Sequence, residues 1–155
     1  MEDNTERLIS AVQDYLDEQD YRYEYEDDSQ VFRLSMSLKS KVSNCRIIIR
    51  PKEDGISFTY ILANSADDEA SKQAIAEFIT RANYGLMIGN FQMDYADGEI
   101  GYKNFMYTGE DIPSGHDIDK NFVIPLLMLE RYGDGILKTL LGYPADKAIE
   151  ECEAD

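Results

Sequence analysis

One segment of the chain places the three residue types of a hydrolase triad side by side, in the run from Ser114 to Asp117. His116, within this run, is the only histidine of the chain. A catalytic triad brings its members together from separate elements, because nucleophile, base and orienting acid must meet in hydrogen-bond geometry. Adjacent loop residues lack that geometry, and nothing else in the sequence resembles a nucleophile elbow. We therefore interpret His116 as an exposed loop residue and predict a protein without catalytic residues, which is not an enzyme.

A second group of polar residues, Asp94, Asp97 and Glu99, has enough carboxylates to suggest a calcium loop. The alternating ligand spacing and the distal glutamate of such loops are missing. Asp97 followed by Gly98 instead favours a two-residue hairpin turn. The acid-rich residues 17–28 are interpreted as solvated surface rather than as a cation site or a nucleic-acid mimic. We expect no metal and no cofactor.

Charge is distributed unevenly along the chain, whose formal net charge is −16. Residues 1–30 contain eleven acidic and two basic residues, whereas residues 31–52 contain six basic residues and no acidic ones. The overall negative charge argues against nucleic-acid binding, which depends on lysine and arginine patches. We expect a protein partner instead. The candidate partner surface consists of Arg33, Lys39, Arg46 and Arg50.

Two interpretations of these four basic residues are compatible with the sequence. If the apolar residues of their strands face the helices, the basic side chains point from the opposite, uncovered face, with Ile48 among them. They would then be available to a partner. Alternatively, Glu24 and Glu26 on the neighbouring strand neutralise them, with each cross-strand pair contributing about 0.2–1 kcal/mol. The sequence leaves both interpretations open.

Hydrophobic periodicity predicts an α+β fold, with a mostly antiparallel sheet of five to six strands and helices on one face. Apolar residues at helical spacing predict helices over residues 4–19, 67–83 and 122–141. The predicted order is αββββαββα. The predicted strands cover residues 21–25, 32–38, 45–50, 56–62, 91–95 and 100–106.

Glycine and proline residues are expected to end or distort these helices. Gly85 is predicted to close the second helix in the left-handed conformation. Pro125 would remove a hydrogen bond from the last helix, which is therefore expected to start late or to kink. Gly133 and Gly135 lie in the same helix, where better helix formers are expected.

The length of 155 residues and the hydrophobic content of 43% suit one packed core. We predict a single domain over residues 1–144, followed by an acidic tail, residues 145–155, that forms a short helical turn or frays. The N-terminal residues are acidic, unlike a signal peptide, and no apolar stretch reaches the length of a membrane span. We therefore predict a cytoplasmic protein that does not bind membranes, with Cys45 and Cys152 as reduced thiols.

The region of the predicted hairpin also carries a family resemblance. The residues concerned are Asn83, Gly89, Phe91, Asp97 and Gly98, with the alternating Leu34, Met36 and Leu38 before them and a leucine-rich helix after them. From the first helix to Leu141 the chain resembles the YbjN-domain family of bacterial proteins. The glycines of the last helix depart from this pattern. The resemblance implies a type III secretion chaperone-like fold.

The same resemblance implies a class of function. Proteins of the YbjN-domain family are described as sensory transduction regulators, and the related secretion chaperones are dimers that hold extended segments of partner chains. We therefore expect a non-enzymatic regulatory or chaperone-like protein that binds other proteins. A homodimer is predicted because one small domain is not expected to cover Phe122, Leu126, Leu129, Ile136 and Leu140 alone. The alternative is a small-ligand-binding protein or enzyme with its pocket between the C-terminal helix and the sheet.

Overall fold

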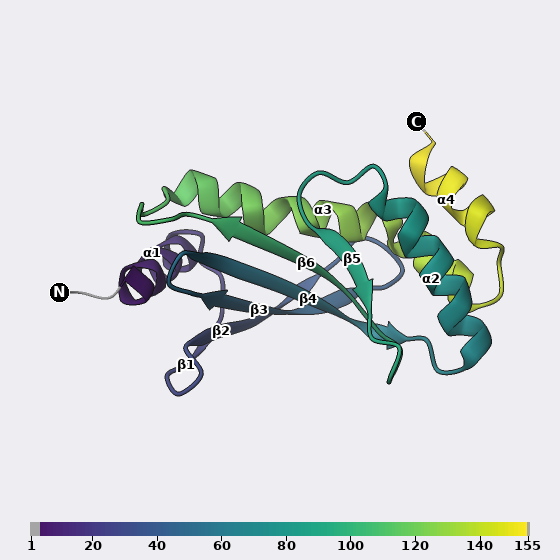
Figure 1. The fold of residues 1–155 in the computed structure, drawn as a ribbon, viewed down its shortest axis with the longest axis horizontal. Helices are drawn as coiled ribbons and strands as arrows, with labels where there is room; N and C mark the ends of the chain where they lie inside the picture. Colours follow the sequence, from purple (N-terminus) through teal and green to yellow (C-terminus); the bar gives the residue numbers. More distant parts are fainter. Residues whose placement is uncertain (1–3, 155) are drawn as a thin grey trace.

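The computed structural model describes residues 4–154 as four helices and a six-stranded antiparallel sheet, which confirms the predicted α+β class. Within the sheet the strands lie in the order β1-β2-β3-β4-β6-β5 (Figure 1). The helices are α1 (Asn4–Glu18), α2 (Glu69–Asn83), α3 (Gly115–Leu140) and α4 (Ala145–Glu153). The strands are β1 (Glu24–Glu26), β2 (Val31–Ser37), β3 (Asn44–Pro51), β4 (Gly55–Ser65), β5 (Asn90–Met93) and β6 (Glu99–Tyr107).

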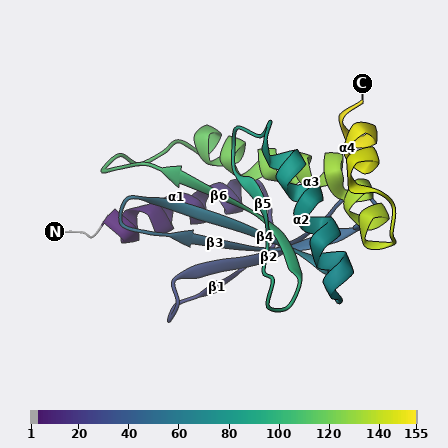
Figure 2. The same cartoon turned by 45° about the vertical axis from the view of Figure 1, so that its right-hand side comes forward.

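All four helices lie on one side of the sheet and leave its other face uncovered (Figures 1 and 2). The core between the two layers is rich in aromatic rings. The ring centroid of Phe122, on α3, lies 6.3 Å from that of Phe58 and 6.2 Å from that of Tyr60, both on β4. These side chains are fully buried. Burial of large rings at these spacings is a main source of the stability of the fold.

Helix α1 follows the predicted pattern, because its apolar side chains form one buried stripe. Leu8, Val12, Tyr15 and Leu16 are all buried. The helix ends where Asp20 adopts a left-handed backbone with φ 58°. Beyond it, the amide of residue 21 donates to the Leu16 carbonyl at 3.0 Å, a bond that satisfies one of the free carbonyls at the helix end.

Helix α3 begins at Gly115, so the expectation of a late start is wrong. Pro125 lies well inside the helix and has no N–H to donate to the carbonyl of Asn121. The side chain of Asn104, on β6, donates to that carbonyl at 3.0 Å, and the hydroxyl of Tyr60 donates to the Phe122 carbonyl at 2.6 Å. The sheet therefore supplies donors where the proline interrupts the helix, and the helix continues.

The two glycines of α3 permit close contacts with neighbouring segments. A Cβ atom at Gly133 would collide with Ser40, in the loop between β2 and β3. One at Gly135 would lie only 2.8 Å from the ring of Phe78, on α2, and 2.5 Å from the sulfur of Cys152, on α4. These residues are glycines because α3 packs tightly here, although glycine disfavours a helix interior.

The connection from α2 to β6 differs from two predictions. Gly85 does not adopt a positive φ, and the left-handed residue of this connection is Gly89, with φ 76°. The turn between β5 and β6 spans residues 94–98 and is therefore longer than two residues. Gly98 is nevertheless required, because its φ is 76° and a Cβ atom there would collide with the carbonyl of Ala66.

The C-terminal segment forms helix α4 rather than a frayed tail. Ala145, Ala148 and Ile149 are buried, and the helix packs against α2 and α3 (Figure 1). In the described part of the chain, Cys45 and Cys152 are free thiols. No helix from residue 4 to 154 is long and apolar enough to cross a membrane.

Candidate partner-binding face

The uncovered side of the sheet carries a group of basic and apolar side chains from four strands. Strand alternation turns every second residue of β2, β3, β4 and β6 away from the helices. We call this surface the open face. It consists of Arg33, Ser35, Arg46, Ile48, Arg50, Thr59, Ile61, Lys103 and Phe105.

The strand register brings these residues into rows across the sheet. Arg33 on β2 is paired with Ile48 on β3, which is paired with Thr59 on β4, which is paired with Lys103 on β6. Directly opposed residues in antiparallel strands have Cβ atoms about 4.5–5.5 Å apart. The row therefore has a positive charge at each end and a partly apolar centre.

The basic residues of the open face differ in whether they are neutralised. Arg33 donates from Nε to Glu26 Oε2 at 2.8 Å, and this bond to Arg33 lowers the pKa of the Glu26 carboxyl. Arg46, Arg50 and Lys103 form no ion pair with any residue from 4 to 154. The predicted intramolecular neutralisation thus applies to Arg33, whereas the other three cations are free.

Apolar groups lie exposed beside these cations. Phe105 is 45% exposed on β6, and its ring lies close to Gly55, where a Cβ atom would be 2.9 Å from a ring carbon. Tyr107, at the end of the same strand, is 73% exposed. Ile48 is paired with Arg33 and Ile61 with Arg46, and both isoleucines are half-buried. A surface that combines aromatic groups with arginine is typical of protein interfaces.

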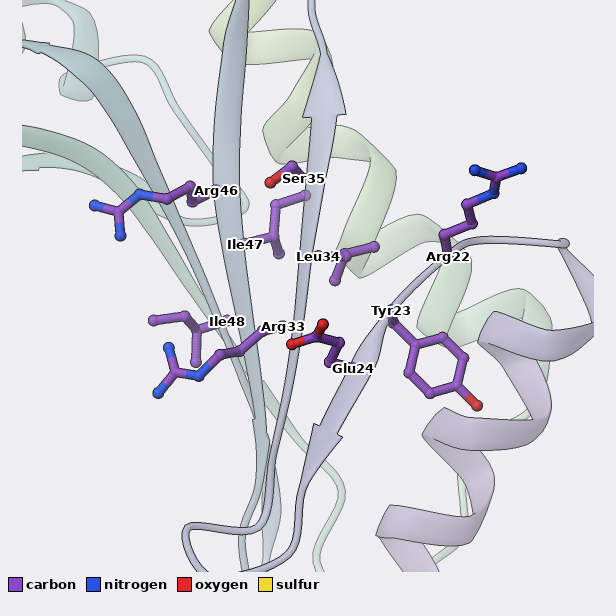
Figure 3. Close-up of a pocket in the computed structure, with 9 residues that line it drawn as sticks. All are labelled: Arg22, Tyr23, Glu24, Arg33, Leu34, Ser35, Arg46, Ile47 and Ile48. Atoms are coloured by element: carbon purple, nitrogen blue, oxygen red, sulfur yellow. The ribbon is translucent and has the colours of Figure 1, made fainter.

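A hollow of about 480 Å³ borders the open face at the edge of β2. Figure 3 shows Arg33 and Arg46 projecting from β2 and β3, with Arg22 and Tyr23 on the other side of β2. We call this space the edge hollow. Its lining consists of Arg22, Tyr23, Glu24, Arg33, Leu34, Ser35, Arg46, Ile47 and Ile48.

The sequence located three of the four candidate residues on this surface and missed another. Lys39 lies beyond the end of β2, and its backbone amide donates to Glu130 Oε2 on α3 at 3.2 Å. It therefore belongs to the loop over α3 and not with Arg33 on the open face. Lys103 was not predicted, although the alternation of residues 99–107 on β6 contains the signal for it.

The residues that suggested a catalytic triad have structural roles or lie exposed. Ser114 is the N-cap of α3, where its hydroxyl accepts a hydrogen bond from the Asp117 amide at 3.1 Å. His116 is exposed in the first turn of the helix. Within residues 4–154, no three acidic, cysteine or histidine side chains are grouped so that they could hold a metal ion.

The tyrosines before β2 divide between core and surface. Only residues 24–26 pair as a strand, so the predicted strand over residues 21–25 is mostly absent. Tyr21 packs on the rings of Tyr15 and Phe122, at centroid distances of 6.1 and 5.4 Å. The Tyr23 hydroxyl donates to Asp17 at 2.7 Å. These contacts attach the segment to the helical layer and draw it away from the edge of β2.

The contact between α3 and the sheet is filled by side chains around Phe122, whereas a hollow of about 480 Å³ lies between Leu137 and Leu140 of α3 and residues 63–65 of β4. The apolar arc of α3 is covered within the single chain. Phe122, Leu126, Leu129 and Ile136 are buried, and Leu140 packs against the core. An uncovered apolar arc on α3 is therefore no longer a reason to predict a homodimer. No contact among the described residues tests the dimer itself.

The chain was also compared with known proteins. No protein-family model, curated protein or solved structure matches it. The geometry of the open face is therefore the main indication of function.

Proposed function

We propose that this protein is a non-enzymatic regulatory or chaperone-like protein that binds an acidic segment of a partner protein on the open face. The observation that carries this proposal is the position of Arg46, Arg50 and Lys103. They lie without ion-pair partners among residues 4–154, beside exposed Phe105, on a sheet face that no helix covers. The rest of the chain is strongly acidic, at a net charge of −16. A basic surface in an acidic protein favours an acidic partner and steers its approach.

A protein partner suits this surface better than a nucleic acid. A phosphate backbone would gain from the three free cations but would be repelled by the net charge of the whole molecule. Acidic side chains also border the open face, with Glu24 and Glu26 on β1 and Glu99 at the start of β6. A peptide segment can place its carboxylates between these borders, whereas a continuous polyanion cannot avoid them.

The resemblance to the YbjN-domain family supports the same class of function. It implies a regulator or chaperone and a homodimer, and we also propose a cytoplasmic location. The open face is a poor dimer surface, because two copies face to face would oppose arginine to arginine. A homodimer would therefore use another surface. Light scattering tests this part, since a mass near 17.7 kDa at tens of micromolar would show a monomer.

The binding proposal is tested with a fluorescein-labelled octapeptide of alternating glutamate and valine, which is acidic and favours an extended backbone. We expect anisotropy to show saturable binding that weakens with salt, because the contact is between charges. Reversing two free cations, Arg46→Glu with Arg50→Glu, should weaken binding by about tenfold or more, which corresponds to about 1.4 kcal/mol.

A matched control variant distinguishes an effect of the open face on peptide binding from an effect of total charge. Arg7 and Lys120 lie exposed on helices α1 and α3 and form no ion pair within residues 4–154. The Arg7→Glu, Lys120→Glu variant changes the net charge by the same amount. It should bind the peptide nearly as well as the wild-type protein. Equal losses in both double variants would contradict a specific role for the open face.

A further inference from the structure

The edge of β2 is only partly occupied by its neighbour β1. The pairing of these strands joins Glu24 to Arg33, Tyr25 to Phe32 and Glu26 to Val31, and extends no further. Strand β2 continues to Ser37. No backbone hydrogen bond joins residues 21–23 to residues 34–37. On the side away from β3, the backbone of Leu34–Ser37 therefore has free hydrogen-bonding groups, since a strand presents every second residue to each neighbour.

At the opposite edge of the sheet, one side chain caps the outer backbone groups of Phe91 on β5. Asn83, at the end of α2, donates from Nδ2 to the Phe91 carbonyl at 3.0 Å. Its Oδ1 accepts a hydrogen bond from the Phe91 amide at 2.8 Å. This amide side chain thus pairs with the backbone of Phe91 as a neighbouring strand would. Edge strands left unprotected are sites of pairing with other chains.

The edge hollow lies directly beside the free part of β2. It has a volume of about 480 Å³ and extends from residues 22–24, across Leu34 and Ser35 of β2, to residues 46–48 of β3 (Figure 3). The Tyr23 hydroxyl is bonded to Asp17 of α1 at 2.7 Å, and its ring packs on Phe32 of β2 at a centroid distance of 5.5 Å, while the backbone of residues 21–23 does not pair with β2. The chain itself therefore holds open the position that a longer β1 would have filled.

The side chains around this position differ between the two sides of the sheet. On the open face, the hollow is bordered by Arg46 on β3, by Glu24, and by Arg33, which is bonded to Glu26. Toward the helices, Leu34 is buried and Met36 is half-buried. A strand added here would alternate between these environments. It would place one set of side chains near the arginines and the other near Leu34 and Met36, so it should alternate acidic and apolar residues.

We propose that the partner segment binds as an additional strand, paired through its backbone with Leu34–Ser37 of β2. This inference rests on the proposed function and adds the mode of binding. The partner is an extended acidic segment with apolar residues at alternate positions, which contacts the edge hollow and Arg46. Backbone pairing supplies affinity in such strand addition, and the alternate side chains supply specificity.

The test uses the full chain and two backbone-methylated versions of the glutamate–valine octapeptide. In one version every glutamate is N-methylated, and in the other every valine. A strand directs the N–H groups of alternate residues to opposite edges. Methylation on the edge that faces β2 should weaken binding by about tenfold or more, which is about 1.4 kcal/mol, whereas methylation on the other edge should have little effect.

Amide hydrogen exchange supplies a second measurement on the protein. Peptide binding should slow exchange within Leu34–Ser37, since added pairing protects strand amides. Phe91, whose amide already donates to Asn83, is the internal control and should not change. An octapeptide of alternating lysine and valine should neither bind nor protect these amides.

Each outcome distinguishes the two proposals. Weaker binding of only one of the two methylated peptides, with slower amide exchange in Leu34–Ser37, supports strand addition. Equal binding of both methylated peptides, with binding still dependent on Arg46 and Arg50, would overturn strand addition and leave the proposed function standing. No binding of the unmodified peptide, or tighter binding of an oligothymidine of equal length, would overturn both.

Discussion

The two faces of the sheet satisfy their polar groups in different ways. On the covered face, the hydroxyls of Tyr60 and Tyr102 each donate to a backbone carbonyl at 2.6 Å, and the rings are buried. On the open face, Arg46, Arg50 and Lys103 lie without ion-pair partners among residues 4–154. Removal of a buried polar partner costs far more than removal of an exposed one. The covered face should therefore determine stability, and the open face should determine binding.

The largest expected effect is alkaline unfolding, which acts on the covered face. Burial raises the pKa of Tyr102 and of Tyr132 to about 12, and burial raises the pKa of Tyr60 further. Because the unfolded pKa is about 10, this stabilisation is complete below pH 10 and is lost as the pH rises toward 12. We expect cooperative unfolding between pH 10 and 12, and circular dichroism measures this transition.

Two substitutions separate buried from exposed tyrosines. Tyr132→Phe removes one buried phenol that ionises. The free energy of unfolding should therefore fall less between pH 7 and pH 12 than it does in the wild-type protein. Tyr84→Phe should leave the midpoint unchanged, because that side chain is 90% exposed. Native circular dichroism retained to pH 12 would contradict this account of the covered face.

An intermediate effect is expected at the proline of α3. Asn104→Leu removes the donor to the Asn121 carbonyl while keeping the side chain similar in size. We expect a loss of about 1–3 kcal/mol in the free energy of unfolding, because a partly buried carbonyl loses its partner. Denaturant titration measures this loss.

A double-mutant cycle makes this prediction specific. Pro125→Ala restores an amide that can bond to the Asn121 carbonyl within the helix. In that background Asn104→Leu should cost clearly less than in the wild-type protein. Equal costs in the two backgrounds would mean that Asn104 acts through packing alone, and that the sheet does not compensate the proline.

The sequence predicted the open face where strand alternation was sufficient and failed where tertiary contacts intervened. Period two correctly placed Arg33, Arg46 and Arg50 on one side of the sheet. It extended β2 too far, since Lys39 lies in a loop held by an acceptor on α3, many residues away in sequence. No local pattern contains that contact.

The same limit applies to the helices. Local propensity treats Pro125 and Gly133 as unfavourable in a helix. The structure accommodates the proline through Asn104 on β6, and the glycine permits contact with the loop at Ser40. Both explanations join segments far apart in the chain, so composition and spacing predicted the type of element but not its continuity. The short β1 has a similar cause, because Tyr21 and Tyr23 bond and pack toward α1.

The smallest expected effect concerns stability on the open face. Arg46→Glu with Arg50→Glu should change the free energy of unfolding by no more than about 0.5 kcal/mol, as is usual for exposed positions without partners. If these arginines instead neutralised Glu24 and Glu26 within the sheet, the reversal would oppose like charges and lower the unfolding midpoint. Arg33→Glu is the matched comparison, because Arg33 is bonded to Glu26 at 2.8 Å, and it should lower the midpoint more than the double variant does. A double variant that loses stability but keeps peptide binding would show that the open face neutralises itself and does not bind the partner.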